Sequence, residues 1–256
     1  GCIVIILRET AKRISSTTRA AQTRTYVRKG ELVPVDAPRA LALEELPQLV
    51  ADYAQAARNA IAAGFDGVEI HAANGYLLAQ FLSDSTNDRT DAYGGPIEHR
   101  ARLLVEVMQA VCAAIGSART GIRLSPVTPA NDIGQDSNPQ ALYNHVGEQL
   151  GTLQLAFVHV IEGATGGARD NASFDYQALR QRCNAPWIVN NGYTRELAVA
   201  AMAEGLADAV AFGRPFIANP DLVERIRRDA PWAAVQRETL YGGREEGYTD
   251  YPTLAA

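Results

Sequence analysis

Short apolar runs alternate along the chain with longer segments whose apolar residues recur at helical spacing. The runs lie at residues 3–7, 67–71, 121–124, 157–161, 187–190 and 209–213. They are rich in Val, Ile and other residues that favour strands, and each looks apolar on both faces. Runs of this kind are typical of a parallel sheet covered by helices. The pattern therefore predicts six strands.

The segments between the runs predict helices with recognisable ends. One helical face is formed by Leu46, Leu49, Val50, Tyr53, Ala57 and Ile61. Gly64 stands where a helix would end, and Pro96 and Pro139 each stand where a first helical residue would lie. Thr194 is a candidate cap for the next helix, and Asn219 opens the last substantial one.

Six strand–helix units in line favour a (β/α)₈ TIM barrel over an open doubly wound sheet, with about six of the eight βα units in this chain. No linker-like tract interrupts the alternation, so we expect a single domain over residues 1–256. The opening residues lack both an initiating methionine and the order of a signal peptide. We therefore expect a fragment, a processed chain or an engineered one that begins at the third strand.

Composition narrows the class of protein. The chain is 47% hydrophobic and carries a net charge of −5, so electrostatics gives no reason to bind nucleic acid or an anionic membrane. No stretch approaches the roughly 20 apolar residues of a membrane span. Cys2, Cys112 and Cys183 are odd in number and far apart, which fits reduced thiols. We expect a soluble, cytoplasmic protein.

Polar residues recur at the carboxyl ends of the predicted strands, where barrel enzymes carry their chemistry. His71 ends one strand, Arg123 lies in the next, and Glu162 follows a third. The sequences NNGY and FGRPF follow the last two strands. The repetition predicts an active site at this end of the barrel more firmly than any single residue does.

His71, Asn74 and Tyr76 are the candidate reacting group. Two neutral donors three residues apart can converge on one oxygen, which suits stabilisation of a developing enolate. A tyrosine phenol keeps its proton at neutral pH and can give it to a carbanion-like carbon. The alternatives are a strand-end histidine bonded to backbone and an aromatic ring packed at a helix start.

Gly192, Gly213 and Arg214 form a candidate phosphate site. The two glycines let backbone N–H groups approach an anion, and the guanidinium adds a fork of donors. The alternative for Gly192 is a plain turn. Arg123 would be costly to bury alone, so it is expected either in a structural salt bridge or beside an electron-rich cofactor ring.

Several motifs together resemble the Old Yellow Enzyme family of flavin-dependent ene-reductases. They are AGFDGVEIHAANGYLLAQFLSDSTNDRTDAYGGPIEHRARLLVEV, GIRLSP, VIEGATGG, NNGYT, DAVAFGRPFIANPDLVERI and LYGGREEGYTDYPTL. The resemblance runs over residues 23–254, and the bacterial xenobiotic and nitrate-ester reductases look most similar. It implies an FMN-binding barrel that takes hydride from NADPH or NADH. The hydride then passes to the β-carbon of an activated alkene such as an enone, and nitro compounds and nitrate esters are further substrates that the resemblance implies.

The same resemblance implies roles for particular residues. By motif, His71 and Asn74 would bind the substrate carbonyl or nitro oxygen, and Tyr76 would be the proton donor. Arg123 would lie against the flavin ring. The residues expected at the FMN phosphate are Gly192, Gly213 and Arg214, and those expected in the substrate pocket are Tyr248 and Asn131.

The chain also departs from the family pattern. The first two barrel strands of the family are missing, and residues 5–9, IILRE, stand where the family has a flavin-contacting Gln-Leu-Trp-His run. A barrel without two strands exposes sheet edges and apolar surface. We therefore expect a homo-oligomer or a complementing chain.

Two other functions remain open at this point. One is a flavin-deficient remnant that acts only through self-association or a partner chain. The other is a non-redox phosphate-binding barrel, which would need a lysine or a metal cluster at the strand ends. The only lysines are Lys12 and Lys29, outside those ends, and no metal site is expected.

Overall fold

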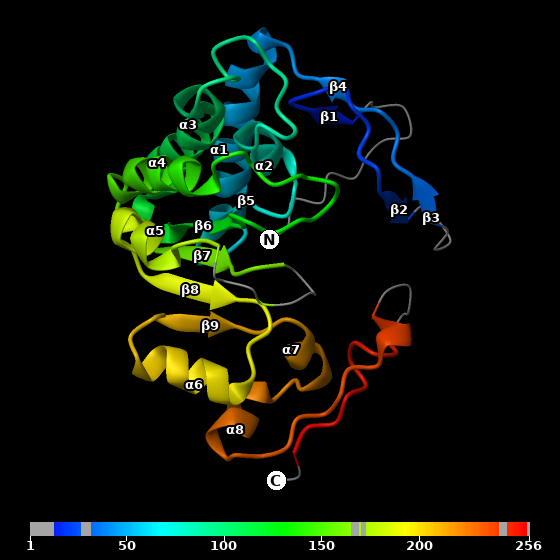
Figure 1. The fold of residues 1–256 in the computed structure, drawn as a ribbon. Coiled ribbons are helices and arrows are strands. Elements are labelled where there is room, and N and C mark those ends of the chain that lie inside the picture. The colour runs from blue at the N-terminus through cyan, green and yellow to red at the C-terminus, as the bar shows by residue number, and fades with distance from the viewer. Residues whose placement is uncertain (1–12, 27–31, 165–168, 170–172, 241–244, 255–256) are drawn as a thin grey trace.

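The fold is built on a five-stranded parallel sheet in the order β5-β6-β7-β8-β9, as the computed structural model shows (Figure 1). The structure describes residues 13–26, 32–164, 169, 173–240 and 245–254. The strands of this sheet are β5 (Val68–Ala72), β6 (Thr120–Leu124), β7 (Phe157–Ile161), β8 (Trp187–Asn190) and β9 (Ala209–Ala211). Each strand pairs with the next one in the chain, as successive strand–helix units should. Five predicted strands are confirmed, and residues 3–7 lie outside the described residues.

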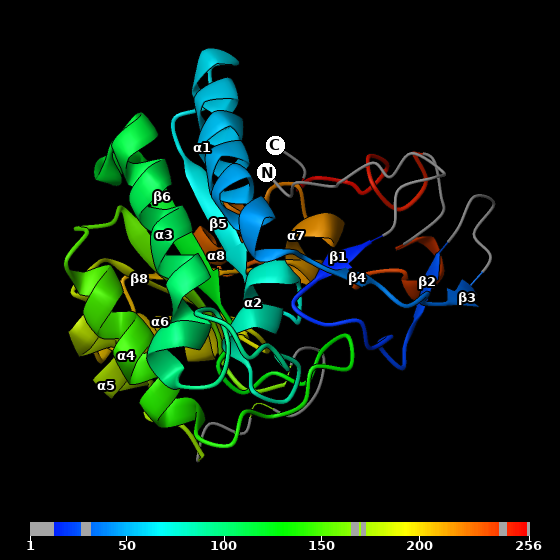
Figure 2. The ribbon, with the colours of Figure 1, turned by 90° about the horizontal axis from the view of Figure 1, so that it is seen from above.

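Helices connect the strands. They are α1 (Leu46–Ala62), α2 (Leu77–Leu82), α3 (Ile97–Ile115), α4 (Pro139–Gly151), α5 (Tyr176–Cys183), α6 (Arg195–Ala203), α7 (Arg214–Ala218) and α8 (Leu222–Arg227). Three 3₁₀ turns lie at η1 (Leu43–Glu45), η2 (Ser117–Arg119) and η3 (Arg237–Thr239). Figures 1 and 2 show α1, α3, α4 and α5 together on one side of the sheet.

The helix ends follow the local sequence. Pro139 is the first residue of α4, and the Thr194 hydroxyl accepts the N–H of Leu197 to cap α6. Gly64 follows α1 with a φ of 92°, a conformation that costs glycine least. Pro96 differs from the expectation by one residue, because it precedes α3 as its N-cap.

The two faces of the sheet differ in chemistry. The face toward the helices is apolar and buried, with Ile70, Ile122, Val158, Val160 and Val189 all at 5% exposure or less. Alternate residues point to the opposite face. That face carries Glu69, His71, Arg123, His159 and Asn190. We call this face, which points away from the helices, the inner face. The prediction that the strands are apolar on both faces is therefore wrong, because the inner face carries polar side chains that contact one another.

Four short strands before α1 were not predicted. β1 (Ile14–Ser15) pairs in parallel with β4 (Arg39–Ala40), and β2 (Arg24–Tyr26) pairs antiparallel with β3 (Leu32–Pro34). Both views show them on the side of the sheet away from α3 and α4 (Figures 1 and 2). Strands of two or three residues carry too little periodicity to be recognised in a sequence.

The loop before α3 is more than a surface connection. The Asn87 side chain is 7% exposed, and its Nδ2 donates to the carbonyls of Phe81 and Tyr93, each at 2.7 Å. Arg89 donates to the carbonyl of Leu41 and pairs with Asp91. These bonds fix the loop against the start of α1.

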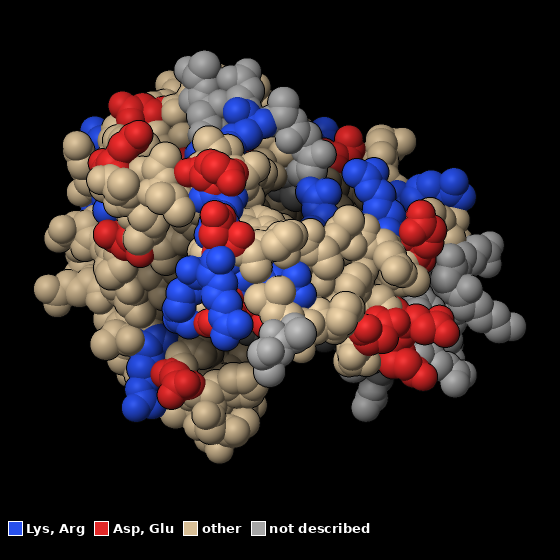
Figure 3. Space-filling model, turned by 90° about the horizontal axis from the view of Figure 1, so that it is seen from below, with Lys and Arg blue, Asp and Glu red and all other residues tan. Residues whose placement is uncertain are grey.

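The surface carries both signs of charge. Figure 3 shows acidic and basic side chains interspersed on the face seen from below. In the part of the chain that the structure describes, no helix is long and apolar enough to cross a membrane.

The packing of α4 on α5 generates a stability prediction. A Cβ on Gly151 would lie 2.2 Å from the carbonyl oxygen of Arg182, a backbone atom that cannot move away alone. Gly151→Ala should therefore lower the free energy of unfolding by about 1–3 kcal/mol, as overpacking does. Thr152→Ala, at the next and exposed position, should change it by less than about 0.5 kcal/mol. Urea unfolding of the two variants measures both, and equal stability would contradict the close approach.

Candidate active site

One row of neighbouring residues crosses the inner face of the sheet. The register pairs His71 of β5 with Arg123 of β6, and Arg123 with His159 of β7. We call these three residues the central row. Parallel strands lie about 4.8 Å apart, so the side chains of the row are immediate neighbours.

Two residues of the central row contact other polar side chains of the inner face. His159 Nδ1 lies 2.9 Å from Glu69 Oε2, and Arg123 Nη2 donates to Asn190 Oδ1 at 3.0 Å. The Nε of Arg123 and the Nε2 of His159 are buried without a hydrogen-bond partner among the described residues. Within the described ranges, Arg123 makes a single side-chain hydrogen bond, to a neutral amide, and no salt bridge, so it keeps donor capacity.

The environment of His71 favours its neutral form. Burial lowers the pKa of this imidazole below its ordinary value, and the neighbouring Arg123 cation lowers it further. Glu69 acts in the opposite direction but is outweighed. A neutral imidazole at physiological pH can donate one hydrogen bond without adding charge to the site.

The turn after β5 brings the other two candidate residues to the same place. Tyr76 N–H donates to the carbonyl of Ala73, and Asn74 adopts a positive φ of 56°. The rings of His71 and Tyr76 lie 5.1 Å apart between centroids. Tyr76 precedes α2 as its N-cap residue and is 53% exposed, so its ring is not simply packed at a helix start.

A cavity of about 280 Å³ opens beside Tyr76. Its lining comes from the segment before α1, from the turn at Gly75 and Tyr76, and from the loop at Asn131. Three arginines line it as well, Arg13, Arg19 and Arg24. His71 and Asn74 are not among the described lining residues, so they lie beyond the edge of this cavity.

The predicted phosphate residues lie together at the ends of β8 and β9. Asn190 is the register partner of Ala211, so Gly192 and Gly213 each follow the paired ends by two residues. Of the residues that the structure describes, a Cβ on Gly213 would meet none within 4 Å, and one on Gly192 would meet only the Arg169 side chain, at 3.8 Å or more. Arg214 is exposed as the first residue of α7.

Two predicted pocket residues have different surroundings. Asn131 lines the cavity, and its Nδ2 donates to the carbonyl of Asn74 at 2.8 Å. Tyr248 is 51% exposed and donates to the carbonyl of Leu240 at 2.7 Å. Among the described residues, no contact joins Tyr248 to the other candidates, so its role in the pocket stays a prediction.

A second polar cluster lies at the end of β7. The buried Glu162 accepts hydrogen bonds from Tyr193 Oη at 2.7 Å and from Arg169 at 2.6 Å. The Arg169 guanidinium also lies 4.0 Å above the Tyr193 ring. Burial and the Glu162 carboxylate raise the pKa of Tyr193. Only Glu162 was singled out in the sequence, because the other two residues reach it from separate segments.

A sequence model described as the NADH:flavin oxidoreductase / NADH oxidase family, whose cofactor is FMN, matches residues 7–232. The chain belongs to this family. Among solved structures, the old yellow enzyme homologue from Zymomonas mobilis is similar with a TM-score of 0.89 and 42% identity. The match covers 95% of this chain and 69% of that one. Morphinone reductase is similar with a TM-score of 0.88 and 40% identity, over 95% of this chain and 67% of that chain.

Plant relatives are similar in sequence. The 12-oxophytodienoate reductase 1 of Oryza sativa subsp. japonica is 47% identical over 85% of this chain and 58% of its own length. The 12-oxophytodienoate reductase 2 of Arabidopsis thaliana is 45% identical over 85% and 59%. The chain thus spans less than two thirds of these two relatives. The resemblance to Old Yellow Enzymes is confirmed, and with it the TIM-barrel class, of which the described sheet supplies five strands.

The residues of this chain fit the FMN of the family. Arg123 has a buried donor that no described group accepts, facing the barrel interior. Gly192 and Gly213 leave open backbone where side chains would otherwise stand, and Arg214 is exposed beside them. An electron-rich ring and a phosphate are the two chemical groups that these features suit.

The charges around His71 generate a pH prediction. Removing the cation in Arg123→Met should raise the pKa of His71, because a repulsive neighbour is lost. Removing the anion in Glu69→Gln should lower it, because an attractive neighbour is lost. NMR titration of the His71 ring, assigned by comparison with His71→Gln, measures both shifts. Shifts in the same direction in the two variants would contradict the electrostatic account.

Proposed function

We propose that this chain, with FMN bound, is an NADPH- or NADH-dependent ene-reductase that acts on small electrophilic alkenes. Enones are the alkenes expected, and nitro compounds and nitrate esters are further substrate classes expected. The observation that carries the proposal is the closeness of the His71 and Tyr76 rings at the carboxyl end of β5, with His71 beside Arg123 and Asn74 in the turn between the two rings. The morphinone reductase structure in complex with tetrahydroNAD supports a nicotinamide reductant.

His71 and Asn74 bind and polarise the substrate. Each donates a hydrogen bond to the carbonyl or nitro oxygen, which draws electron density away from the β-carbon of the alkene. Neutral donors suit this task, and the lowered pKa of His71 favours the neutral form of its imidazole at neutral pH. The bound FMN supplies the hydride chemistry, from the nicotinamide to that β-carbon.

Tyr76 completes the reaction by giving its phenolic proton to the α-carbon. Tyr76 is 53% exposed, which leaves its phenol accessible to a substrate, and its ring lies 5.1 Å from that of His71 between centroids. The tyrosine regains a proton from solvent after each turnover. The Arg123 guanidinium would stabilise negative charge on the bound cofactor.

Tyr76→Phe tests the proton donor. The variant should take up FMN and be reduced by NADPH or NADH at the normal rate, because the phenol takes no part in those steps. Reoxidation by 2-cyclohexenone should be slower by about 10²–10⁴-fold, the usual contribution of a general acid. Stopped-flow absorbance separates the two steps, and unchanged reoxidation would exclude Tyr76 as the donor.

Arg214→Ala tests the phosphate site. Loss of a charge-assisted hydrogen bond should weaken FMN binding about tenfold or more. Arg227→Ala is the matched control, because Arg227 is exposed on α8 and pairs only with Glu224 among the described residues. Quenching of flavin fluorescence during titration gives both affinities. Equal affinity of the two variants would remove Arg214 from the site.

A further inference from the structure

The backbone of Asn74 is held in a left-handed conformation, with a φ of 56°. Residues with a Cβ adopt this conformation at a cost in energy, which asparagine tolerates better than most. The direction of the Asn74 side chain depends on this backbone, because φ and ψ fix where the Cβ points. Groups that hold the backbone therefore aim the side chain.

Two side chains from other elements hold Asn74 on both sides of its Cα. The Ser125 hydroxyl accepts the N–H of Asn74 at 2.8 Å, and Asn131 Nδ2 donates to the carbonyl of Asn74 at 2.8 Å. Ser125 directly follows β6 and is 8% exposed, whereas Asn131 lies in the loop between β6 and α4. One bond restrains φ and the other restrains ψ.

We propose that Ser125 and Asn131 are positioning residues that aim the Asn74 side chain at the substrate oxygen. This inference rests on the proposed function and gives Asn131 a role through Asn74 rather than a direct contact with substrate. Neither residue acts on the reacting atoms. Their effect on substrate is expected to disappear when the Asn74 side chain is removed.

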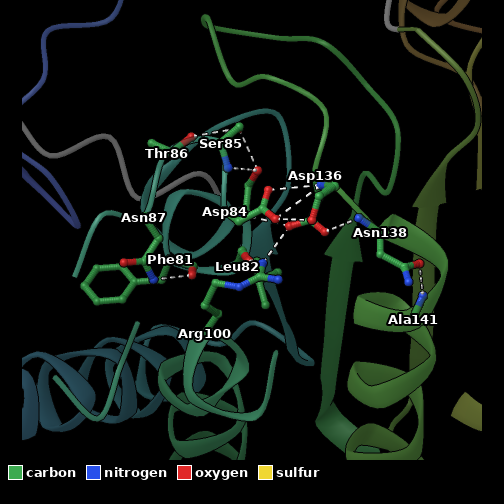
Figure 4. Close-up of polar contacts among 12 residues, drawn as sticks. Phe81, Leu82, Asp84, Ser85, Thr86, Asn87, Arg100, Asp136, Asn138 and Ala141 are labelled. Atoms are coloured by element: carbon green, nitrogen blue, oxygen red, sulfur yellow. Dashed lines mark hydrogen bonds and ion pairs between the residues drawn. The ribbon is translucent and has the colours of Figure 1, made fainter. Parts of the chain in front are cut away.

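The loop that carries Asn131 is firmly anchored. Asp136 is 7% exposed, and its carboxylate accepts Arg100 Nη1 at 2.6 Å and the N–H of Asp84 at 3.0 Å (Figure 4). Arg100 is 4% exposed and also donates to the carbonyls of Leu82 and Gly95. A buried pair with this many partners holds its geometry well.

The same loop is fixed at two further points. Asp84 accepts the N–H of Ser137 at 3.0 Å. Nearer to Asn131, a Cβ on Gly75 would lie 2.6 Å from the carbonyl oxygen of Ala130. The loop therefore lies directly against the turn that contains Asn74, and Asn131 cannot shift without disturbing that contact.

Ser125→Ala and Asn131→Ala test the inference in FMN-loaded protein. Titration with 4-hydroxybenzaldehyde, followed by the flavin absorbance, should show about tenfold weaker binding in each, the usual effect of one lost hydrogen bond. The KM for 2-cyclohexenone should rise and the FMN affinity should stay unchanged. In an Asn74→Ala background, the same two substitutions should have no further effect. Gln135→Ala, at an exposed position of the same loop whose side chain makes no hydrogen bond among the described residues, is the control and should bind like wild type.

A readout in flavin-free protein tests the geometry separately. Hydrogen exchange of the Asn74 amide, measured by NMR, should be faster in Ser125→Ala than in wild type or Gln135→Ala. Unchanged exchange there would show that the hydroxyl does not hold this amide and would overturn the role of Ser125. Asn131 lies exposed in its loop, so its variant should fold even if Ser125→Ala is unstable.

The outcomes separate the inference from the proposed function. If Asn74→Ala weakens the aldehyde but Ser125→Ala and Asn131→Ala do not, the positioning role is wrong and the proposed function stands. Full additivity with Asn74→Ala would equally overturn it, because Asn131 would then act on the ligand by itself. If Asn74→Ala itself leaves binding unchanged, the proposed role of Asn74 fails, and the positioning role fails with it.

Discussion

The register of the parallel sheet decides where every candidate side chain lies. Because β5, β6 and β7 pair in register, His71, Arg123 and His159 form one row on the inner face. The register partners Asn190 and Ala211 likewise align the loops that contain Gly192 and Gly213. A slip of one residue in any strand would turn its polar side chains toward the helices. The buried Val and Ile side chains on the opposite face prevent that slip.

The turn after β5 adds a second constraint. The sheet brings Asn74 to the correct end of the barrel but does not orient its side chain, since the residue lies beyond the strand. Orientation comes from Ser125 and Asn131, and the second of these depends on a loop held by Arg100 and Asp136. The proposed contact with substrate thus depends on the strained backbone of Asn74, and strained backbone positions are common at active sites.

Much of the fold could be predicted from the sequence, because strand and helix periodicities survive in single segments. The β-branched runs located β5 to β9, and Pro139 and Thr194 marked helix starts correctly. The short strands β1 to β4 were missed, since their existence depends on pairing between distant residues. The polar inner face was also missed: Glu69 and His159 are 90 residues apart, and each looks incidental in its own strand.

The sequence predicted those site residues that lie close together in the chain or at the ends of successive strands. His71, Asn74 and Tyr76 fall within six positions, and their motif carried the family resemblance. The contact of Asn131 with Asn74 spans 57 positions, and that of Arg169 with Glu162 needs a side chain to fold back over Tyr193. Such contacts have no periodicity, so a structure was required to find them.

One anaerobic titration measures whether this chain holds FMN in front of His71, Asn74 and Tyr76. Purified protein is mixed with FMN, freed of excess flavin, reduced with NADPH or NADH, and then mixed with 2-cyclohexenone. We expect a yellow complex of one FMN per chain that bleaches on reduction and recovers its colour with the enone. A colourless protein that does not take up FMN would contradict it and favour a chain that acts only through self-association or a partner.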